Sequence, residues 1–107
     1  MKLVISIINS DDAGAVTKNL SKRGFYYTKL STSGGLLKSG NVTLLSAVED
    51  DKVDDIIGVY SEFSRRRTHT VTPYADFSDL FTAGSAVEVS VGGATIMVLD
   101  IQRFEKL

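Results

Sequence analysis

A strand-like segment followed by a helix-like segment occurs twice in this chain, and this order most constrains the possible folds. Residues 2–9 (KLVISIIN) form an apolar, β-branched run typical of a buried strand. Residues 10–23 then place apolar side chains at helical spacing. Residues 42–49 and 50–67 repeat the order of strand and helix. With right-handed crossovers, two such units place both helices on one face of an antiparallel sheet.

Capping residues and charges mark the ends of both predicted helices. Ser10 or Asp11 is expected to cap the first helix, and Gly24 to end it. The second helix starts among carboxylates and ends at the run Arg65–Arg67, so its charges oppose the helix dipole at both ends. This role explains the carboxylates better than a metal site does, and the arginines better than a contact with phosphate or nucleic acid. The carboxylates are Glu49, Asp50, Asp51, Asp54 and Asp55.

Three further segments complete the pattern. Residues 25–31 are aromatic and β-branched and predict a strand. Residues 68–85 have no regular pattern, and loops of this length are usually functional or disordered. Residues 86–99 predict a hairpin that turns at Gly92–Gly93, because this register places apolar side chains on one face. The expected pairs are Val91 with Ala94, Val89 with Ile96 and Val87 with Val98.

These elements predict an α+β fold, the ferredoxin-like βαββαβ sandwich, with its last strand doubled into a hairpin. The length predicts a single domain over residues 1–107. The strand at residues 2–9 is apolar on both faces, but the helices cover only one face of the sheet. The other face is therefore expected to drive self-association. The strand carries Leu3, Ile5 and Ile7 on one face and Val4 and Ile8 on the other.

Composition and charge exclude several classes of protein. The absence of cysteine excludes disulfides, thiolate catalysis and cysteine-bound zinc. A net charge of −1 and a pI of about 5.7 give no general attraction to nucleic acid or to an anionic membrane. No segment has the length of a membrane span or the pattern of a signal peptide, so a cytoplasmic protein is expected.

No group of residues predicts catalysis. His69 is the only histidine, and we expect it to be exposed in a loop rather than part of a catalytic triad or metal site. RNA-recognition modules share the βαββαβ order, but they need aromatic residues on the central strands. Residues 2–9 and 42–49 contain none. We therefore expect a binding protein without catalytic residues, a metal or a cofactor.

The segment Ser31–Asn41 (STSGGLLKSGN) allows two interpretations. It lacks the order of a phosphate-binding loop, because Asn41 and Val42 follow Gly40 where lysine and serine or threonine are required. Its composition favours a plain connection between two strands. Its length of about ten residues and its apolar pair Leu36–Leu37 favour a loop that contacts a ligand. The residues alone leave both interpretations open.

Nearly the whole chain carries motifs that form a specific combination, namely YTKLSTSGGLLKSGNVTLL, VEDDKVDDII and VEVSVGGATIMVL. This combination resembles the PII-like cyclic-di-AMP receptor family of Gram-positive bacteria. The resemblance implies a homotrimer whose sheets face the trimer centre, with one cyclic-di-AMP per subunit in clefts between neighbouring subunits. It also implies a signal transducer without catalytic activity, whose mobile loop at residues 68–85 relays binding to an unknown downstream protein.

The resemblance also implies a role for individual residues. Thr28 is expected to donate a hydrogen bond to a phosphate. Gly34 and Gly35 are expected to offer backbone amides with no side chain in the way. Leu37 is expected to form a wall against an adenine, and Asn41 to hydrogen-bond a base or to brace the loop. Such donors and apolar walls suit a compact dinucleotide with two phosphates.

Other positions concern the edge of the site and departures from the family pattern. Gly93, in the VGGAT motif, is expected to lie at a strand edge that approaches the ligand. The family pattern has an arginine at Tyr26, an asparagine at Gly24 and an aromatic residue at Leu36. Tyr26 removes a bidentate contact but can stack on a base, and Leu36 weakens stacking. The alternative function is a PII-like protein-interaction module whose nucleotide specificity is weak, lost or changed.

Overall fold

The computed structural model describes residues 1–30, 40–71 and 87–107. The elements in chain order are β1 (Lys2–Asn9), α1 (Ser10–Lys22), β2 (Thr28–Leu30), β3 (Asn41–Val48), the short 3-10 helix η1 (Asp50–Lys52), α2 (Val53–Phe63), β4 (Arg67–Val71), β5 (Val87–Val91) and β6 (Ala94–Asp100).

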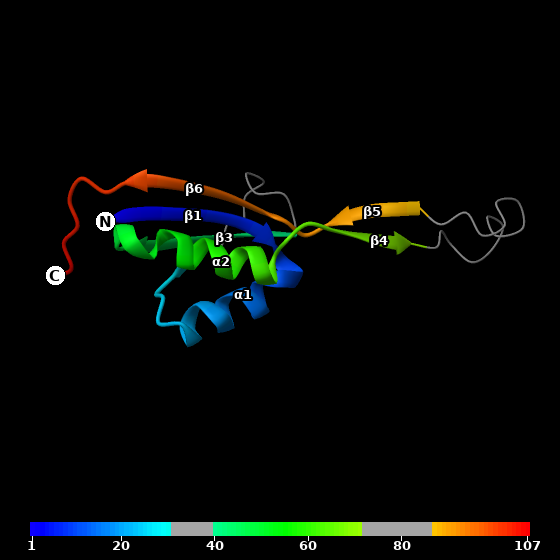
Figure 1. Cartoon of the computed structure of the whole chain (residues 1–107), viewed down its shortest axis with the longest axis horizontal. Coiled ribbons are helices and arrows are strands. Elements are labelled where there is room, and N and C mark those ends of the chain that lie inside the picture. Colours follow the sequence, from blue (N-terminus) through cyan, green and yellow to red (C-terminus); the bar gives the residue numbers. More distant parts are fainter. Residues whose placement is uncertain (31–39, 72–86) are drawn as a thin grey trace, which may run out of the picture.

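Four of the strands form an antiparallel sheet in the order β2-β3-β1-β6. Strand β1 is central, with Ile5 opposite Leu45 of β3 on one side and opposite Met97 of β6 on the other. Both helices lie against one face of this sheet (Figure 1). The predicted α+β fold is confirmed to this extent, and the strand order is compatible with a ferredoxin-like fold.

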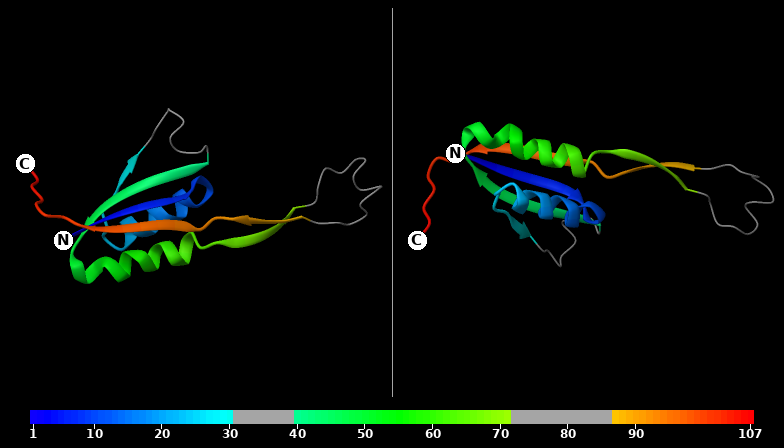
Figure 2. Two further views of the ribbon diagram at one scale, coloured as in Figure 1. Left: turned by 90° about the horizontal axis from the view of Figure 1, so that it is seen from above. Right: turned by 60° about the horizontal axis from the view of Figure 1, so that its bottom comes forward.

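The predicted hairpin at Gly92–Gly93 is wrong. Strand β5 pairs with β4, and β6 pairs with β1, so β5 and β6 follow one another in the same direction (Figures 1 and 2). Both glycines have positive φ, at 77° and 95°, and they link the two strands. Alternation of apolar residues shows which side chains share a face, but it does not show which strand lies alongside.

Strands β4 and β5 form a two-stranded antiparallel ribbon, which we call the arm. It leaves the body of the protein beyond the end of α2 and projects away from the four-stranded sheet (Figure 2). Its first pair is Arg67 opposite Val91. Residues 68–85 were expected to be irregular, but residues 68–71 belong to β4. Residues 72–86, and with them most of the expected mobile loop, lie outside the described residues.

Helix α2 ends at Phe63, four residues before the predicted end at Arg67. The side chain and the backbone N–H of Ser64 both donate to the carbonyl oxygen of Tyr60, at 2.6 and 2.8 Å. Ser64 has φ −135° and ψ 17°, outside the helical range, and the chain then extends into β4. A local side-chain hydrogen bond of this kind competes with continuation of the helix. The arginine run therefore does not form the basic last turn that we predicted.

The ends of α1 differ slightly from the prediction. The N-cap is Asn9 rather than Ser10 or Asp11, and its side chain accepts a hydrogen bond from the backbone N–H of Asp11 at 2.8 Å. Gly24 is confirmed at the C-terminal end, with φ 83°. The N–H of Phe25 completes this cap by donating to the Leu20 carbonyl at 2.8 Å. Strand β2 therefore starts only at Thr28, not at residue 25.

The core lies between the helices and the sheet. It is formed by Val4, Ile8, Ala13, Val16, Leu20, Val42, Leu44, Val48, Ile56, Val59 and Tyr60. No described element covers the opposite sheet face, where Ile5, Leu45 and Met97 align across three strands. No helix in the described part of the chain is long and apolar enough to cross a lipid bilayer.

The Tyr60 hydroxyl is buried in this core without a hydrogen-bond partner among the described residues. Burial raises the pKa of the Tyr60 phenol above its ordinary value of about 10, and the nearby Ser6 hydroxyl offsets this only in part. The folded state therefore holds the Tyr60 proton more tightly than the unfolded state does. This contribution to stability is complete below pH ~10 and is lost as the pH rises through the pKa of the folded state.

Replacing Tyr60 by phenylalanine tests both consequences. We expect Tyr60→Phe to leave the free energy of unfolding at pH 7 unchanged or to raise it by about 1 kcal/mol, because no buried hydroxyl is then left unpaired. The variant is also expected to lose less stability than the wild type above pH ~10. Urea denaturation followed by circular dichroism at both pH values measures this. Tyr27→Phe, at a tyrosine that is 37% exposed, is the control. A clear loss of stability for Tyr60→Phe at pH 7 contradicts the prediction.

Candidate functional site

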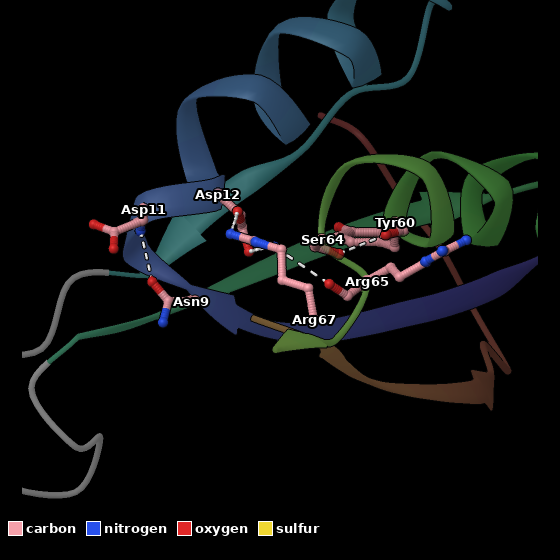
Figure 3. A network of polar contacts seen from close by, with 7 residues as sticks. All are labelled: Asn9, Asp11, Asp12, Tyr60, Ser64, Arg65 and Arg67. Carbon is pink, nitrogen blue, oxygen red and sulfur yellow. Dashed lines mark hydrogen bonds and ion pairs between the residues drawn. The ribbon is translucent and has the colours of Figure 1, made fainter. Parts of the chain in front are cut away.

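An ion pair fixes the base of the arm to the start of α1 (Figure 3). The guanidinium of Arg67 donates to both carboxylate oxygens of Asp12, at 2.7 and 3.3 Å. The Asp12 side chain is only 8% exposed, whereas that of Arg67 is 41% exposed. Asp12 raises the pKa of the Arg67 guanidinium above its ordinary value, mainly through these hydrogen bonds. The bidentate geometry sets the direction of the side chain as well as its position.

Gly92 leaves room for this ion pair. Arg67 Nη1 also donates a hydrogen bond to the Arg65 carbonyl at 3.2 Å. The same guanidinium lies close to Gly92, in the link between β5 and β6. A Cβ atom at Gly92 would lie 2.5 Å from Arg67 Nη1 and 3.1 Å from the Arg65 carbonyl oxygen. A side chain at Gly92 would therefore displace Arg67, in addition to the strain of its positive φ.

A pocket of about 570 Å³ lies beside this ion pair, where α2 ends and the arm begins. We call it the arm-base pocket. Its apolar wall is formed by Ile57 and Ile96. Its other lining residues are Ile7, Ile8, Asn9, Asn41, Tyr60, Ser61, Ser64, Arg65, Arg66, Gly92, Gly93, Ala94 and Thr95. Its volume and its mixture of apolar and polar walls are typical of small-molecule sites.

A second pocket, of about 340 Å³, lies at the other end of β3, and we call it the Tyr26 pocket. It is lined by Arg23, Gly24, Phe25, Tyr26, Ala47, Val48, Glu49, Lys52 and Asp55. The Tyr26 side chain is 88% exposed, and Lys106 Nζ lies 5.9 Å from its ring centroid. This distance is compatible with a cation–π contact.

The whole chain, residues 1–107, matches the family model described as "Cyclic-di-AMP receptor". The chain belongs to the cyclic-di-AMP receptor family. The family resemblance of the sequence is thereby confirmed, and the family is one of receptors rather than enzymes. The crystal structure of a functionally unknown protein from Pediococcus pentosaceus ATCC 25745 is similar, with 34% identity and a TM-score of 0.77. The match covers 99% of this chain and 96% of that chain.

Among the described residues of this family member, two of the predicted ligand residues lie in one pocket. Asn41, the first residue of β3, and Gly93 both line the arm-base pocket. Tyr26 lines the other pocket together with Ala47. Ala47 lies six positions after Asn41 along β3, a distance of about 20 Å. Tyr26 and Asn41 therefore line different pockets.

The remaining predicted ligand residues have other positions. Thr28 begins β2, is exposed, and lies opposite Leu45 at the edge of the sheet. Gly24 also lines the Tyr26 pocket. Gly34, Gly35, Leu36 and Leu37 lie outside the described residues. The ligand contacts of all these residues stay predictions.

The sequence analysis missed the separate roles of three consecutive arginines. It placed Arg65, Arg66 and Arg67 in a basic helix end, but Arg67 forms an ion pair in β4 and the other two line the arm-base pocket. The run Arg67–Val71 (RTHTV) carries β-branched residues that signal a strand. No local signal pairs Arg67 with Asp12, because 55 positions separate them.

The carboxylates at the start of α2 form no metal site in the described residues, where no three histidine, aspartate or glutamate residues are grouped to hold an ion. Asp50 forms an ion pair with the N-terminal amine of Met1 at 2.7 Å. This amine, mainly by donating a hydrogen bond, lowers the pKa of the Asp50 carboxyl. Asp54 and Asp55 lie in the first turn of α2, where their negative charges interact favourably with the positive end of the helix dipole.

Alanine substitutions of the two linking glycines test the close approach of Arg67. Both substitutions introduce strain of about 1–2 kcal/mol from positive φ. Only Gly92→Ala also meets Arg67, since a Cβ at Gly93 has its nearest neighbour, Arg66 Cβ, at an ordinary 3.5 Å. We expect Gly92→Ala to lower the melting temperature by about 4 °C or more beyond Gly93→Ala, measured by differential scanning calorimetry.

The control for this prediction is to make Gly92→Ala and Gly93→Ala in an Arg67→Gln background. Without the guanidinium, the difference in melting temperature between the two alanine variants is expected to shrink to what the 3.1 Å approach to the Arg65 carbonyl oxygen leaves. Equal melting temperatures in the wild-type background contradict the proposed role of Gly92. A difference of undiminished size in the Arg67→Gln background assigns it to the backbone, through strain or the Arg65 carbonyl oxygen, instead.

Proposed function

We propose that this protein binds cyclic-di-AMP as a cytoplasmic homotrimer and relays binding through its arm to a downstream protein. The observation that carries the proposal is the match of the whole chain to the cyclic-di-AMP receptor family. The ligand-binding residues in this proposal are Tyr26, Thr28, Gly34, Gly35, Leu36, Leu37, Asn41 and Gly93. The protein acts as a receptor, with neither a catalytic residue nor a cofactor.

The sheet face that no described element covers, which we call the bare face, supports assembly. Its apolar side chains come from all four strands, and several are more than two-fifths exposed, including Leu30, Met97 and Leu99. An apolar surface of this kind on a small protein marks an interaction site. A second and third copy of the chain, each contributing the same face, form a closed assembly that removes this surface from water.

The separation of the predicted contacts supports a site between subunits. Tyr26 and Asn41 lie in different pockets at opposite ends of β3. A neighbouring subunit that packs along the sheet supplies the wall that one chain lacks. In this arrangement the loop at residues 31–39 and the edge strand β2 face the ligand from one subunit.

The arm is suited to relay binding. Gly92 and Gly93 line the arm-base pocket and also connect the arm to the sheet. Arg67, at the start of β4, is held by Asp12. A ligand in contact with Gly93 therefore lies next to the groups that fix the direction of the arm. Residues 72–86, which the arm carries, are the proposed contact with the partner.

Tyr26 favours a second candidate function, a PII-like protein-interaction module with changed nucleotide specificity. An aromatic ring that is 88% exposed offers a flat surface for a base but no charge for a phosphate. The Lys106 ammonium near this ring is the only cation described over its face. Such a site favours bases over phosphates, and so allows ligands other than cyclic-di-AMP.

Ligand titration separates the two candidates. We expect cyclic-di-AMP to raise the melting temperature of the purified protein, and cyclic-di-GMP and ATP to have little effect. At a hundredfold excess over Kd the stabilisation is about 2.7 kcal/mol. Differential scanning fluorimetry measures the shift, with isothermal titration calorimetry for the stoichiometry of one ligand per subunit. The absence of a shift with any of the three nucleotides contradicts the receptor function, and a shift with ATP alone indicates another ligand.

Two adjacent residues of β6 test the assembly. Met97 lies on the bare face opposite Ile5, whereas Val98 lies on the helix side opposite Val4, and the two are 43% and 42% exposed. We expect the wild type and Val98→Glu to be trimers and Met97→Glu to be a monomer, by light scattering coupled to size-exclusion chromatography. A wild type that is monomeric at micromolar concentration refutes the trimer.

A further inference from the structure

We infer that Arg65 and Arg66 bind the phosphates of the ligand in the arm-base pocket. The inference rests on the proposed function, because it assumes that cyclic-di-AMP is bound. It adds two residues that neither the sequence motifs nor the family assigns to the ligand. These residues supply the positive charge that Tyr26 does not.

The charge of the arm-base pocket has one sign. Its lining includes Arg65 and Arg66, and no carboxylate lines it among the residues that the structure describes. The Tyr26 pocket instead combines two cations, Arg23 and Lys52, with two carboxylates, Glu49 and Asp55. A ligand with two phosphate charges is therefore attracted more strongly to the arm-base pocket.

The cations of the two pockets also differ in their partners. Arg23 is paired with Glu62 at 3.0 Å, and Lys52 approaches Asp55 at 3.8 Å. Among the described side chains, no carboxylate lies within 4.0 Å of either Arg65 or Arg66. Both are exposed, so their guanidinium groups are free to meet an anion. A planar guanidinium matches two phosphate oxygens in bidentate geometry.

The ion pair at the base of the arm keeps these two side chains in place. Asp12 engages Arg67, and the Arg65 carbonyl accepts a hydrogen bond from the same guanidinium. The backbone at Arg65 is thereby fixed, while its side chain points away from Asp12 and back along α2 (Figure 3). The stem of Arg66 lies over Gly93, since a Cβ atom there would lie 3.5 Å from Arg66 Cβ.

The rest of the pocket suits the other parts of a nucleotide. Ile57 and Ile96 form an apolar wall against which a base can lie. Asn41, at the start of β3, offers a side-chain amide for the polar edge of a base. Phosphate donors and base contacts thus lie around one pocket, at the end of the sheet from which the arm projects.

Charge-neutralising variants with matched controls test the inference. We propose titration of cyclic-di-AMP into the full-length protein by isothermal titration calorimetry, for Arg65→Gln, Arg66→Gln and the double variant. As controls, Lys18→Gln and Lys22→Gln remove the same charge from exposed positions of α1 that line neither described pocket. We expect each single pocket variant to raise Kd about tenfold and the double variant about a hundredfold, as for lost charge-assisted hydrogen bonds. The controls are expected to change Kd less than threefold.

Two further measurements separate a phosphate contact from a general effect. Arg66→Lys keeps the charge but not the bidentate geometry, so it is expected to have a Kd between those of the wild type and Arg66→Gln. Raising the ionic strength is expected to weaken binding by the wild type more than by the double variant. Circular dichroism and light scattering establish that the variants keep the fold and assembly of the wild type.

The possible failures are distinguishable. If the wild type binds cyclic-di-AMP and the double variant binds it within threefold, the inference is wrong and the receptor function stands. If Lys18→Gln and Lys22→Gln weaken binding as much as the pocket variants do, the effect is general electrostatics and the inference is also wrong. If the wild type does not bind cyclic-di-AMP, the receptor function itself fails, and the inference fails with it.

Discussion

The fold depends on β1, because this strand is hydrogen-bonded along both edges and is apolar on both faces. Its pairing with β3 and β6 places strands that are distant in sequence side by side. Val4 and Ile8 anchor the helices on one face, and Ile5 lies on the face that no described element covers. The last residue, Asn9, also caps α1. Burial of one face, exposure of the other and the start of the first helix therefore all follow from this strand.

The sequence predicted the parts of the fold that local patterns determine. The run at residues 2–9 and the cap at Gly24 are each specified by neighbouring residues, and both are confirmed. The hairpin at Gly92–Gly93 was wrong because alternating side chains fit any apolar neighbour, and the edge of β1 lies more than 80 positions away in sequence. The end of α2 was misplaced because the Ser64 hydroxyl donates back to the Tyr60 carbonyl oxygen, a local contact that competes with continuation of the helix.

The candidate site was predictable only in part, for the same reason. Asn41 and Gly93 were expected near the ligand, and the fold brings both to one pocket, Asn41 from the start of β3 and Gly93 from the link before β6. Arg65 and Arg66 join them only because α2 ends early, so an error in the helix boundary concealed their position. Asp12 resembled an ordinary carboxylate in the first turn of a helix, and its partner Arg67 became evident only in three dimensions.

The ion pair between Asp12 and Arg67 also has a consequence for the alignment of the arm. Arg67 lies opposite Val91, the residue before Gly92, so the first rung of the two-stranded ribbon is set where the ribbon joins the body. A slip of one position would turn every side chain of β5 to the opposite face. In one of the two directions it would also replace Gly92 near the guanidinium with Val91, which carries a side chain. The ion pair and the absence of a side chain at Gly92 thus define the register in which β4 and β5 pair at the base of the arm.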